Sequence, residues 1–236
     1  MRETPGPGRT VERRIVAIVA KAPRAGEVKT RLCPPLDPAG AARLSRAFLL
    51  DKIEQVRSLE GVRHAIVYAP EEARPVFLGL APDFALTPQR GRDLGERLVA
   101  SFAELFADGH EGVLLIDSDT PTLPTEYLLE ALDLIAKPEV DLVVGPSEDG
   151  GYYLVGLRAP RPTLFEGIPW STPAVLAETL ERARRLGLGV RRLPLWWDVD
   201  TGSDLARLQA QLAATAGPGP RHTRRLVPAL ATTQGS

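Results

Sequence analysis

Two pairs of aspartates have the residue type and spacing of ligands for a divalent metal ion. Asp117 and Asp119 directly follow the apolar run Gly112–Ile116, and Asp198 and Asp200 alternate within the segment LWWDVDTGSDL. Alternate residues of an extended chain point to the same side, so Asp198 and Asp200 are expected to face one site. Carboxylate oxygens suit a hard cation such as Mg²⁺ or Mn²⁺, which can bridge to substrate phosphates. The pattern predicts a divalent metal near Asp119, with the other three aspartates as further candidate ligands.

Helix capping is the competing interpretation of these polar segments. Asp119, Thr120 or Thr122 can satisfy the free amides at the start of a following helix. Thr201 and Asp204 have the spacing of a capping box, in which each side chain bonds to the other's backbone amide. An Asp-x-Asp sequence alone does not decide between a metal site and a cap, but its place at a strand end opposite a basic loop favours the metal site.

The loop Lys21–Leu32, KAPRAGEVKTRL, is the predicted phosphate-binding segment. Gly26 allows the backbone to approach a ligand closely, and lysine and arginine neutralise phosphate oxygens through charged hydrogen bonds. The Gly-x-x-x-x-Gly-Lys-Ser/Thr spacing of a Walker A loop is absent. A solvated charged turn is the alternative. The four cations of the loop are Lys21, Arg24, Lys29 and Arg31.

Two further turns contain polar residues that can contact a substrate. Gln89 and Arg90 follow the apolar run Phe84–Thr87 and are assigned to nucleotide binding. Glu148 and Asp149 are adjacent carboxylates in GPSEDGGYYLVGL, and we assign them as the catalytic residues, one of which can serve as a general base or orient a substrate hydroxyl. An Asp-Gly hairpin turn explains Asp149 equally well.

Short apolar runs alternate with stretches of helical spacing, and these elements must position the polar loops. This alternation predicts a single-domain α/β fold with a mostly parallel sheet and helices on both faces. Ligands of such sheets bind outside the carboxyl ends of the strands, where the polar loops are expected. The predicted strands are Ile15–Ala20, Val62–Tyr68, Phe84–Thr87, Gly112–Ile116, Val140–Gly145, Tyr152–Leu157 and Val190–Leu193.

Length and composition limit the domain organisation and the partners. The 236 residues fit one domain, which we place at residues 13–214, between a flexible N-terminal tail at residues 1–12 and a disordered C-terminal tail at residues 215–236. A formal net charge of −1 provides no basic surface field for a nucleic acid. A single cysteine and three scattered histidines do not suggest a zinc site.

Membrane association is not expected from this sequence. No apolar run approaches the roughly 20 residues that cross a bilayer. The N-terminal segment MRETPGPGRTVERR lacks the apolar stretch of a signal peptide. A cytoplasmic location is therefore the expectation.

Taken together, the motifs resemble those of the DUF2064 family of GT-A type glycosyltransferases, some of which are linked to arsenosugar biosynthesis. The matching segments occur in order: AKAPRAGEVKTRL, QRGRDLGERL, DSDTPTLP, GPSEDGGYYLVGL, LFEGIPWST and DVDTGSDL. They extend from Ala20 to about Leu205, which is nearly the whole predicted domain. The resemblance implies the fold of nucleotide-diphospho-sugar transferases (GT-A) and a nucleotide or sugar nucleotide as ligand, with a small-molecule acceptor.

The resemblance also implies roles for individual residues. Lys29 and Arg31 match the cations of the family's phosphate loop, and Asp119 matches the acid of its Gly-Ser-Asp-x-Pro motif, a metal ligand. Asp117 departs from the pattern, because the family commonly has glycine there. The remaining matches are Glu148 and Asp149 in the Glu-Asp-Gly-Gly turn, and Asp198 and Asp200 in the Asp-x-Asp-Thr before the last helix.

Three functions follow from these patterns. Glycosyl transfer from a sugar nucleotide, dependent on Mg²⁺ or Mn²⁺, is the leading expectation. The basic loop and the DVDT segment also resemble those of nucleotidyltransferases of the same fold, such as phospholactate guanylyltransferase, which neutralise a triphosphate and release pyrophosphate. An inert nucleotide-binding protein is the third alternative.

Overall fold

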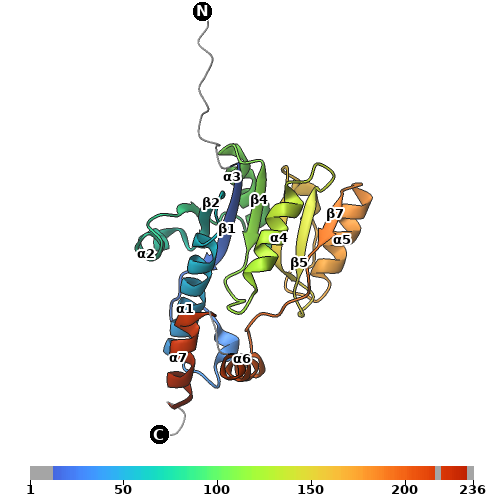
Figure 1. Cartoon of the computed structure of the whole chain (residues 1–236). Helices are drawn as coiled ribbons and strands as arrows, with labels where there is room; N and C mark the ends of the chain where they lie inside the picture. The colour runs from blue at the N-terminus through green and yellow to red at the C-terminus, as the bar shows by residue number, and fades with distance from the viewer. Residues whose placement is uncertain (1–12, 216–218, 233–236) are drawn as a thin grey trace, which may run out of the picture.

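The computed structural model describes residues 13–215 and 219–232. The predicted N-terminal tail, residues 1–12, lies outside the described residues. The described chain forms one seven-stranded sheet in the order β3-β2-β1-β4-β6-β5-β7 (Figure 1). The strands are β1 (Arg14–Lys21), β2 (Arg63–Ala69), β3 (Ala85–Pro88), β4 (Gly112–Ile116), β5 (Leu142–Pro146), β6 (Tyr152–Leu157) and β7 (Val190–Arg192).

The sheet is parallel except for β6, which runs antiparallel to both β4 and β5. In β4 and β5 every residue is buried, since helices cover both faces of the sheet, and this explains their continuous apolar sequences. All seven strands therefore lie where the apolar runs predict them, with ends that differ by no more than two residues. The mostly parallel α/β sheet is confirmed.

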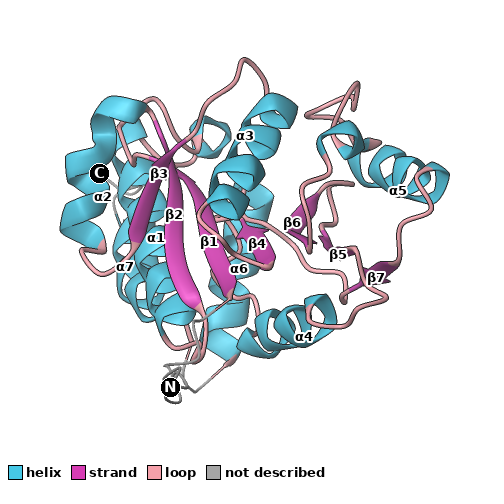
Figure 2. Cartoon of the chain, turned by 90° about the horizontal axis from the view of Figure 1, so that it is seen from above, coloured by secondary structure: helices cyan, strands magenta, loops and turns pink. Residues whose placement is uncertain are grey.

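Helices pack on both faces of the sheet (Figure 2). On one face α1, α2 and α4 share a core with alternate residues of β1, such as Val16 and Ile18. On the other face α3 and α5 pack against the intervening residues Ile15 and Ala17. The helices are α1 (Pro38–Arg57), α2 (Arg74–Leu80), α3 (Leu94–Ala107), α4 (Thr125–Ile135), α5 (Val175–Arg185), α6 (Gly202–Ala214) and α7 (Arg221–Thr232), with short 3₁₀ turns at Thr30–Leu32, Glu71–Ala73 and Pro162–Leu164.

The C-terminal segment corrects the prediction of a disordered tail at residues 215–236. Within it, α7 forms a helix that lies alongside α1 (Figure 1). The Asp51 carboxylate accepts hydrogen bonds from the backbone amides of His222 and Thr223, both at 2.8 Å, and so caps the helix. Val227 is buried in a third core cluster with residues of α1 and α6. A cap supplied by a distant helix leaves no local pattern, whereas the prolines and glycines of the segment are typical of a chain without regular structure.

The order in which strands are added to the sheet reverses between the neighbouring strands β1 and β4. From β1 the chain continues to β2 and β3 on one side, and from β4 it continues to the strands on the other side. Loops that leave the carboxyl ends of such strands diverge and leave a crevice between them. Both the loop after Lys21 and the Asp117–Asp119 segment begin at this crevice.

Among the helices of the described residues, none is long and apolar enough to cross a membrane.

Candidate functional site

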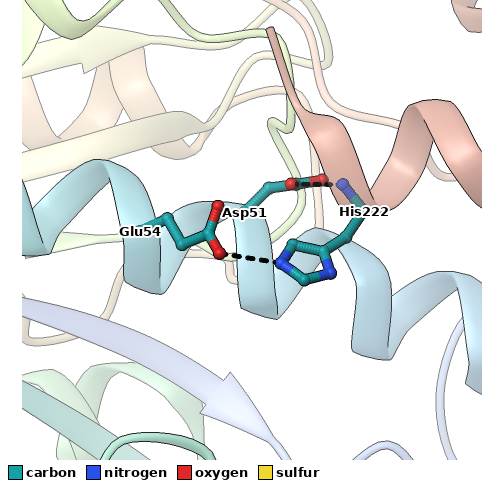
Figure 3. A group of neighbouring side chains, drawn as sticks. All are labelled: Asp51, Glu54 and His222. Atoms are coloured by element: carbon teal, nitrogen blue, oxygen red, sulfur yellow. Dashed lines mark hydrogen bonds and ion pairs between the residues drawn. The ribbon is translucent and has the colours of Figure 1, made fainter.

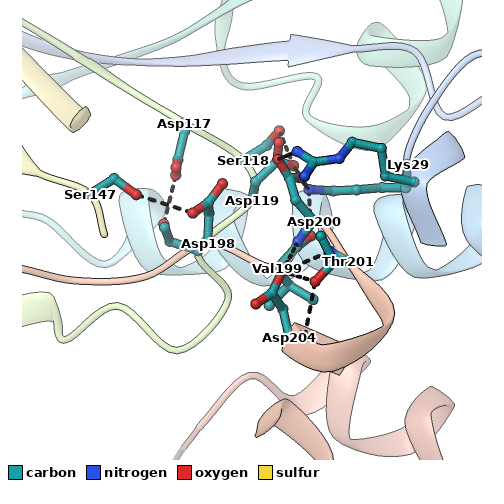
Figure 4. Close-up of polar contacts among 12 residues, drawn as sticks. Lys29, Asp117, Ser118, Asp119, Ser147, Asp198, Val199, Asp200, Thr201 and Asp204 are labelled. Carbon is teal, nitrogen blue, oxygen red and sulfur yellow. Dashed lines mark hydrogen bonds and ion pairs between the residues drawn. The ribbon is translucent and has the colours of Figure 1, made fainter. Parts of the chain in front are cut away.

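Lys29 joins the two predicted metal-ligand segments (Figure 4). Its Nζ lies 3.0 Å from Asp119 Oδ1 and 2.7 Å from Asp200 Oδ1, and it also donates a 2.7 Å hydrogen bond to the carbonyl oxygen of Val199. The two carboxylates therefore point to one position that a positive charge occupies. Hard oxygen donors from two loops around a single cationic centre also fit Mg²⁺ or Mn²⁺.

The backbone and burial of Lys29 are unusual for a phosphate-binding lysine. Its φ of 50° and ψ of 35° place it in the left-handed region, which lysine rarely adopts. Its side chain is only 4% exposed. Burial alone lowers the pKa of Lys29, but the charges of Asp119 and Asp200 outweigh it, and the pKa is raised. Lys29 therefore remains charged and paired, whereas the sequence predicts a cation free for phosphate.

The aspartate segments are fixed by their own backbone contacts. The amide of Val199 donates a 3.0 Å hydrogen bond to the carbonyl oxygen of Asp119, which ties the two loops together. Thr201 and Asp204 form the predicted capping box at the start of α6. Capping therefore explains Thr201 and Asp204, while Asp200, one residue earlier, is left to contact Lys29.

Asp198 lies beside Asp200, on the side away from Lys29. Ser147 Oγ donates a 3.1 Å hydrogen bond to Asp198 Oδ1. Burial, followed by the charges of Asp200 and Asp149, raises the pKa of Asp198 to about 6. Crowded carboxylates that resist full ionisation are typical of sites that bind a cation, because the cation relieves their repulsion.

Asp117 is linked through Thr120 to a buried lysine that the sequence patterns did not single out. Lys52 of α1 is 1% exposed, and its Nζ donates to the carbonyl oxygen and Oγ1 of Thr120 at 3.1 and 3.2 Å. Thr120 Oγ1 in turn donates a 2.6 Å hydrogen bond to Asp117 Oδ1. Burial lowers the pKa of Lys52 to about 8, against the charges of Asp117 and Asp119. Burial likewise raises the pKa of Asp117 to about 7, although Lys52 opposes the rise.

A cleft of about 610 Å³ opens beside this cluster. Lys29, Asp117, Asp119 and Asp200 line one side, and Lys21 and Arg31 of the predicted phosphate loop line it as well. Arg31 is 72% exposed and lies 3.8 Å from Asp200 Oδ2. The segment QRGRDLGERL adds Arg92 and Arg97, which the sequence patterns did not assign to a site.

A larger cavity, of about 1220 Å³, lies at the opposite end of β1, remote from the aspartates. Its lining includes Arg13, Arg14 and His110.

The remaining residues predicted to bind the nucleotide are Gly26, Gln89 and Arg90. Gly26 lies in a turn, and the side chains of Gln89 and Arg90 contact other parts of the protein. Gly26 has a φ of 81°, which favours glycine. Gln89 lines the cleft, but its Nε2 donates to the carbonyl oxygens of Ala20 and Val67 and so joins β1 to β2. Arg90 is exposed, is not among the lining residues, and lies 3.8 Å from Glu104.

Glu148 and Asp149, the predicted catalytic pair, have different surroundings. Glu148 accepts two hydrogen bonds from the Arg207 guanidinium, at 2.7 and 3.0 Å, and this pairing lowers its pKa. A carboxylate with a lowered pKa is a poor general base, so the geometry disfavours that role for Glu148. Asp149 is exposed, close enough to Asp198 to affect its pKa, and accepts a 2.9 Å hydrogen bond from the Gly151 amide.

Asp51, Glu54 and His222 form another group with potential metal ligands (Figure 3). One ligand atom from each lies within 4.8 Å of the others. These atoms are already hydrogen-bonded: Asp51 caps α7, and Glu54 accepts from His222 Nε2 at 2.9 Å and from Arg221. A metal would have to displace the contacts that dock α7, so we interpret this group as a helix-docking contact.

Comparisons with known proteins support the fold and identify the family. The model of the DUF2064 family, described as uncharacterized proteins conserved in bacteria, matches residues 52–172. No functionally curated protein matches the sequence. A solved structure from Desulfovibrio desulfuricans G20, assigned as a nucleotide-diphospho-sugar transferase, is 33% identical with a TM-score of 0.86, over 94% of this chain and 96% of that one.

More distant solved structures share the fold. The CMP:2-keto-3-deoxy-manno-octonic acid synthetase complexed with CTP has a TM-score of 0.56 at 14% identity, over 85% of this chain and 98% of that one. A mannosyltransferase from Pyrobaculum calidifontis, in complex with GDP-Man and Mn²⁺, has a TM-score of 0.51 at 17% identity, over 92% of this chain and 68% of that one. The chain belongs to the DUF2064 family and has the α/β fold of a nucleotide-diphospho-sugar transferase.

Proposed function

We propose that this protein is a metal-dependent nucleotide-diphospho-sugar transferase that moves a sugar from a sugar nucleotide to a small acceptor. One observation carries the proposal: Asp119 and Asp200 converge from two loops on one cation position, beside a cleft whose lining includes Lys21 and Arg31. Carboxylates for a divalent cation next to lysine and arginine are the groups that bind and neutralise a diphosphate.

Asp119 and Asp200 are the residues that would hold Mg²⁺ or Mn²⁺, with Asp198 adjacent. The donor set fits, since both carboxylates already accept hydrogen bonds from one ammonium group. A bound cation would neutralise charge on the diphosphate leaving group. Lys21 and Arg31, which line the cleft, would bind the phosphate oxygens. The mannosyltransferase of similar fold, whose structure contains GDP-Man and Mn²⁺, supports this choice of donor and metal.

Asp149 is the proposed base for the acceptor hydroxyl. Its Oδ1 accepts from the Gly151 amide, which orients the carboxylate, and Oδ2 is the atom that would receive the proton. Gly150 allows this turn to pack closely, because a Cβ there would lie 2.2 Å from the carbonyl oxygen of Pro173. The turn therefore holds the carboxylate in one orientation at the surface, outside the lining of the cleft and close enough to Asp198 to affect the pKa of that residue.

Nucleotidyl transfer is the second candidate, and the number of cations favours it. Lys21, Arg31, Arg92 and Arg97 all line the cleft, although Arg92 is paired with Glu96, and such cations suit a triphosphate. A phosphate acceptor is already anionic, so this reaction needs no base at Asp149 and depends on positioning and charge neutralisation.

The released product separates these reactions. The protein would be incubated with Mn²⁺ and either sugar nucleotides plus small acceptor alcohols or nucleoside triphosphates plus sugar phosphates. Glycosyl transfer releases a nucleoside diphosphate from the first set, and nucleotidyl transfer releases pyrophosphate from the second. Ligand binding without turnover in either set would indicate an inert nucleotide-binding protein and contradict both proposals.

A further inference from the structure

We infer that the Lys29 ammonium and the divalent cation compete for the same carboxylate oxygens, so that metal binding transfers Lys29 from Asp119 and Asp200 to the nucleotide phosphates. This inference rests on the proposed function, because it concerns the same two aspartates. Through this exchange of partners, Lys29 would couple the binding of the metal to the binding of the phosphates.

The first argument is a count of hydrogen-bond donors. A lysine ammonium has three N–H groups. Lys29 Nζ has three oxygen acceptors, namely Asp119 Oδ1 at 3.0 Å, Asp200 Oδ1 at 2.7 Å and the carbonyl oxygen of Val199 at 2.7 Å. With all three donors used, Lys29 can bind a phosphate only after it gives up at least one of these partners.

The second argument is the proximity of two positive charges. Mg²⁺ binds carboxylate oxygens at about 2.1 Å. A cation bound to Asp119 Oδ1 would therefore lie no more than about 5 Å from Lys29 Nζ, which is 3.0 Å from the same oxygen. Carboxylate oxygens that donate electron density to a divalent ion are weaker acceptors for an ammonium. Repulsion between the cation and the ammonium, and the weaker hydrogen bonds to the carboxylates, both favour movement of the Lys29 ammonium away from Asp119 and Asp200.

The third argument is that the cleft offers Lys29 a new position. Lys29 lines the cleft together with Lys21 and Arg31, so its side chain already borders the space where phosphates would bind. Its ammonium is also 5.8 Å from the centre of the Phe48 ring. The backbone at Lys29 lies in the left-handed region, and such local strain clusters at active sites, ligand clamps and switch regions.

Competition predicts opposite effects of one substitution on two ligands. Lys29→Met removes the competing charge, so the affinity for Mn²⁺ alone should rise by about tenfold, the value of one charge-assisted hydrogen bond. The same substitution removes a phosphate contact, so the affinity for GDP in the presence of saturating Mn²⁺ should fall by about tenfold or more. Calorimetric titration of the purified full chain measures both affinities.

Arg31→Met is the matched control. Arg31 is a cation near Asp200, at 3.8 Å, but it is mostly exposed and does not occupy the oxygen atoms that Lys29 shares. Its removal should change the Mn²⁺ affinity by less than about threefold, because exposed ion pairs contribute little. A rise in Mn²⁺ affinity equal to that of Lys29→Met would show a general charge effect and overturn the inference.

If Lys29→Met destabilises the protein, its melting temperature with and without Mn²⁺ provides a second test. Without Lys29 the aspartates repel, so the melting temperature should fall and should be restored by Mn²⁺ to a greater extent than in the wild type. Unchanged or weaker Mn²⁺ binding by both Lys29→Met and Lys29→Gln would overturn the competition while leaving the proposed function intact. Mn²⁺ binding that survives Asp119→Asn and Asp200→Asn would instead contradict the proposed function.

Discussion

At the scale of single residues, the site is a balance of nearby charges. Asp117, Asp119, Asp198 and Asp200 are half-buried, and two buried lysines oppose them, Lys29 on the cleft side and Lys52 on the α1 side. Lys29 contacts two aspartates directly, whereas Lys52 reaches Asp117 through Thr120. The arrangement separates a pair that contacts Lys29, Asp119 and Asp200, from Asp117, which accepts a hydrogen bond from Thr120.

Lys52→Met should destabilise the protein strongly. It leaves Asp117 without its buried counter-charge, and removal of one partner from a buried pair costs about 3–5 kcal/mol. Adding Asp117→Asn should recover part of this loss, because the uncompensated charge is then removed. Urea unfolding measures the four free energies of the cycle, with the exposed Lys137→Met as control at less than about 0.5 kcal/mol. Additive losses would show that Lys52 does not stabilise Asp117.

Glu148→Gln and Asp149→Asn should have very different effects on turnover. Glu148 is an exposed partner of Arg207, and such pairs contribute about 0–1 kcal/mol, so the substitution should leave kcat nearly unchanged. Under glycosyl transfer, Asp149→Asn removes the base and should lower kcat by about 10²–10⁴-fold while sugar-nucleotide binding persists. A steady-state assay measures kcat for both variants, and each serves as the control for the loss of a carboxylate charge in the same turn. A collapse of kcat in Glu148→Gln alone would reverse the assignment.

At the scale of elements, α1 contacts both the site and the C-terminal helix. Lys52 and Gln55 bond to the segment after Asp119, where Gln55 Nε2 donates to the carbonyl oxygen of Leu123 at 2.6 Å. Asp51 and Glu54, one residue earlier in each case, bond to the start of α7. One turn of α1 thus holds the segment after Asp119 on one side and α7 on the other.

Asp51→Ala should release α7 selectively. Loss of a helix cap costs about 0.5–2 kcal/mol, and Asp51 accepts hydrogen bonds from two backbone amides of α7 and from Thr223 Oγ1. Amide hydrogen exchange should accelerate across residues 221–228 and remain slow in β1 and β4. Asp37→Ala, which removes the cap of α1 itself, provides the comparison. Equal protection of α7 in wild type and Asp51→Ala would contradict the docking assignment.

Acidification should weaken the same contact through Glu54. Burial is the largest single influence and raises the pKa of Glu54, but the hydrogen bonds and charges of His222 and Arg221 together outweigh it, and the pKa is lowered. A group with a lowered folded-state pKa stabilises above its ordinary value near 4.5 and loses this contribution as the pH falls through the lower value. The difference in α7 exchange between wild type and Glu54→Gln should therefore be present at pH 7 and disappear in acid. A difference that persists at a pH low enough to protonate Glu54 would contradict this sign.

At the scale of the whole molecule, apolar periodicity predicted the sheet because strands buried on both faces need continuous apolar runs. The antiparallel direction of β6 had no such signature, since a buried strand has the same composition in either direction. Residue types located the aspartates, but their partners come from distant elements. Lys29 meets Asp200 and Lys52 meets Thr120 only after folding, so sequence alone assigned Lys29 to phosphate and overlooked Lys52.

The central claim is that one cation, held by Asp119 and Asp200, contacts the phosphates of the nucleotide. Paramagnetic broadening of the ³¹P resonances of bound GDP by Mn²⁺ tests it directly, since the broadening falls with the inverse sixth power of the distance between the ion and the phosphorus. We predict strong broadening with the wild type and with Asp117→Asn, and loss of the protein-dependent effect in both Asp119→Asn and Asp200→Asn. Undiminished broadening in either of the last two variants would contradict the shared metal site.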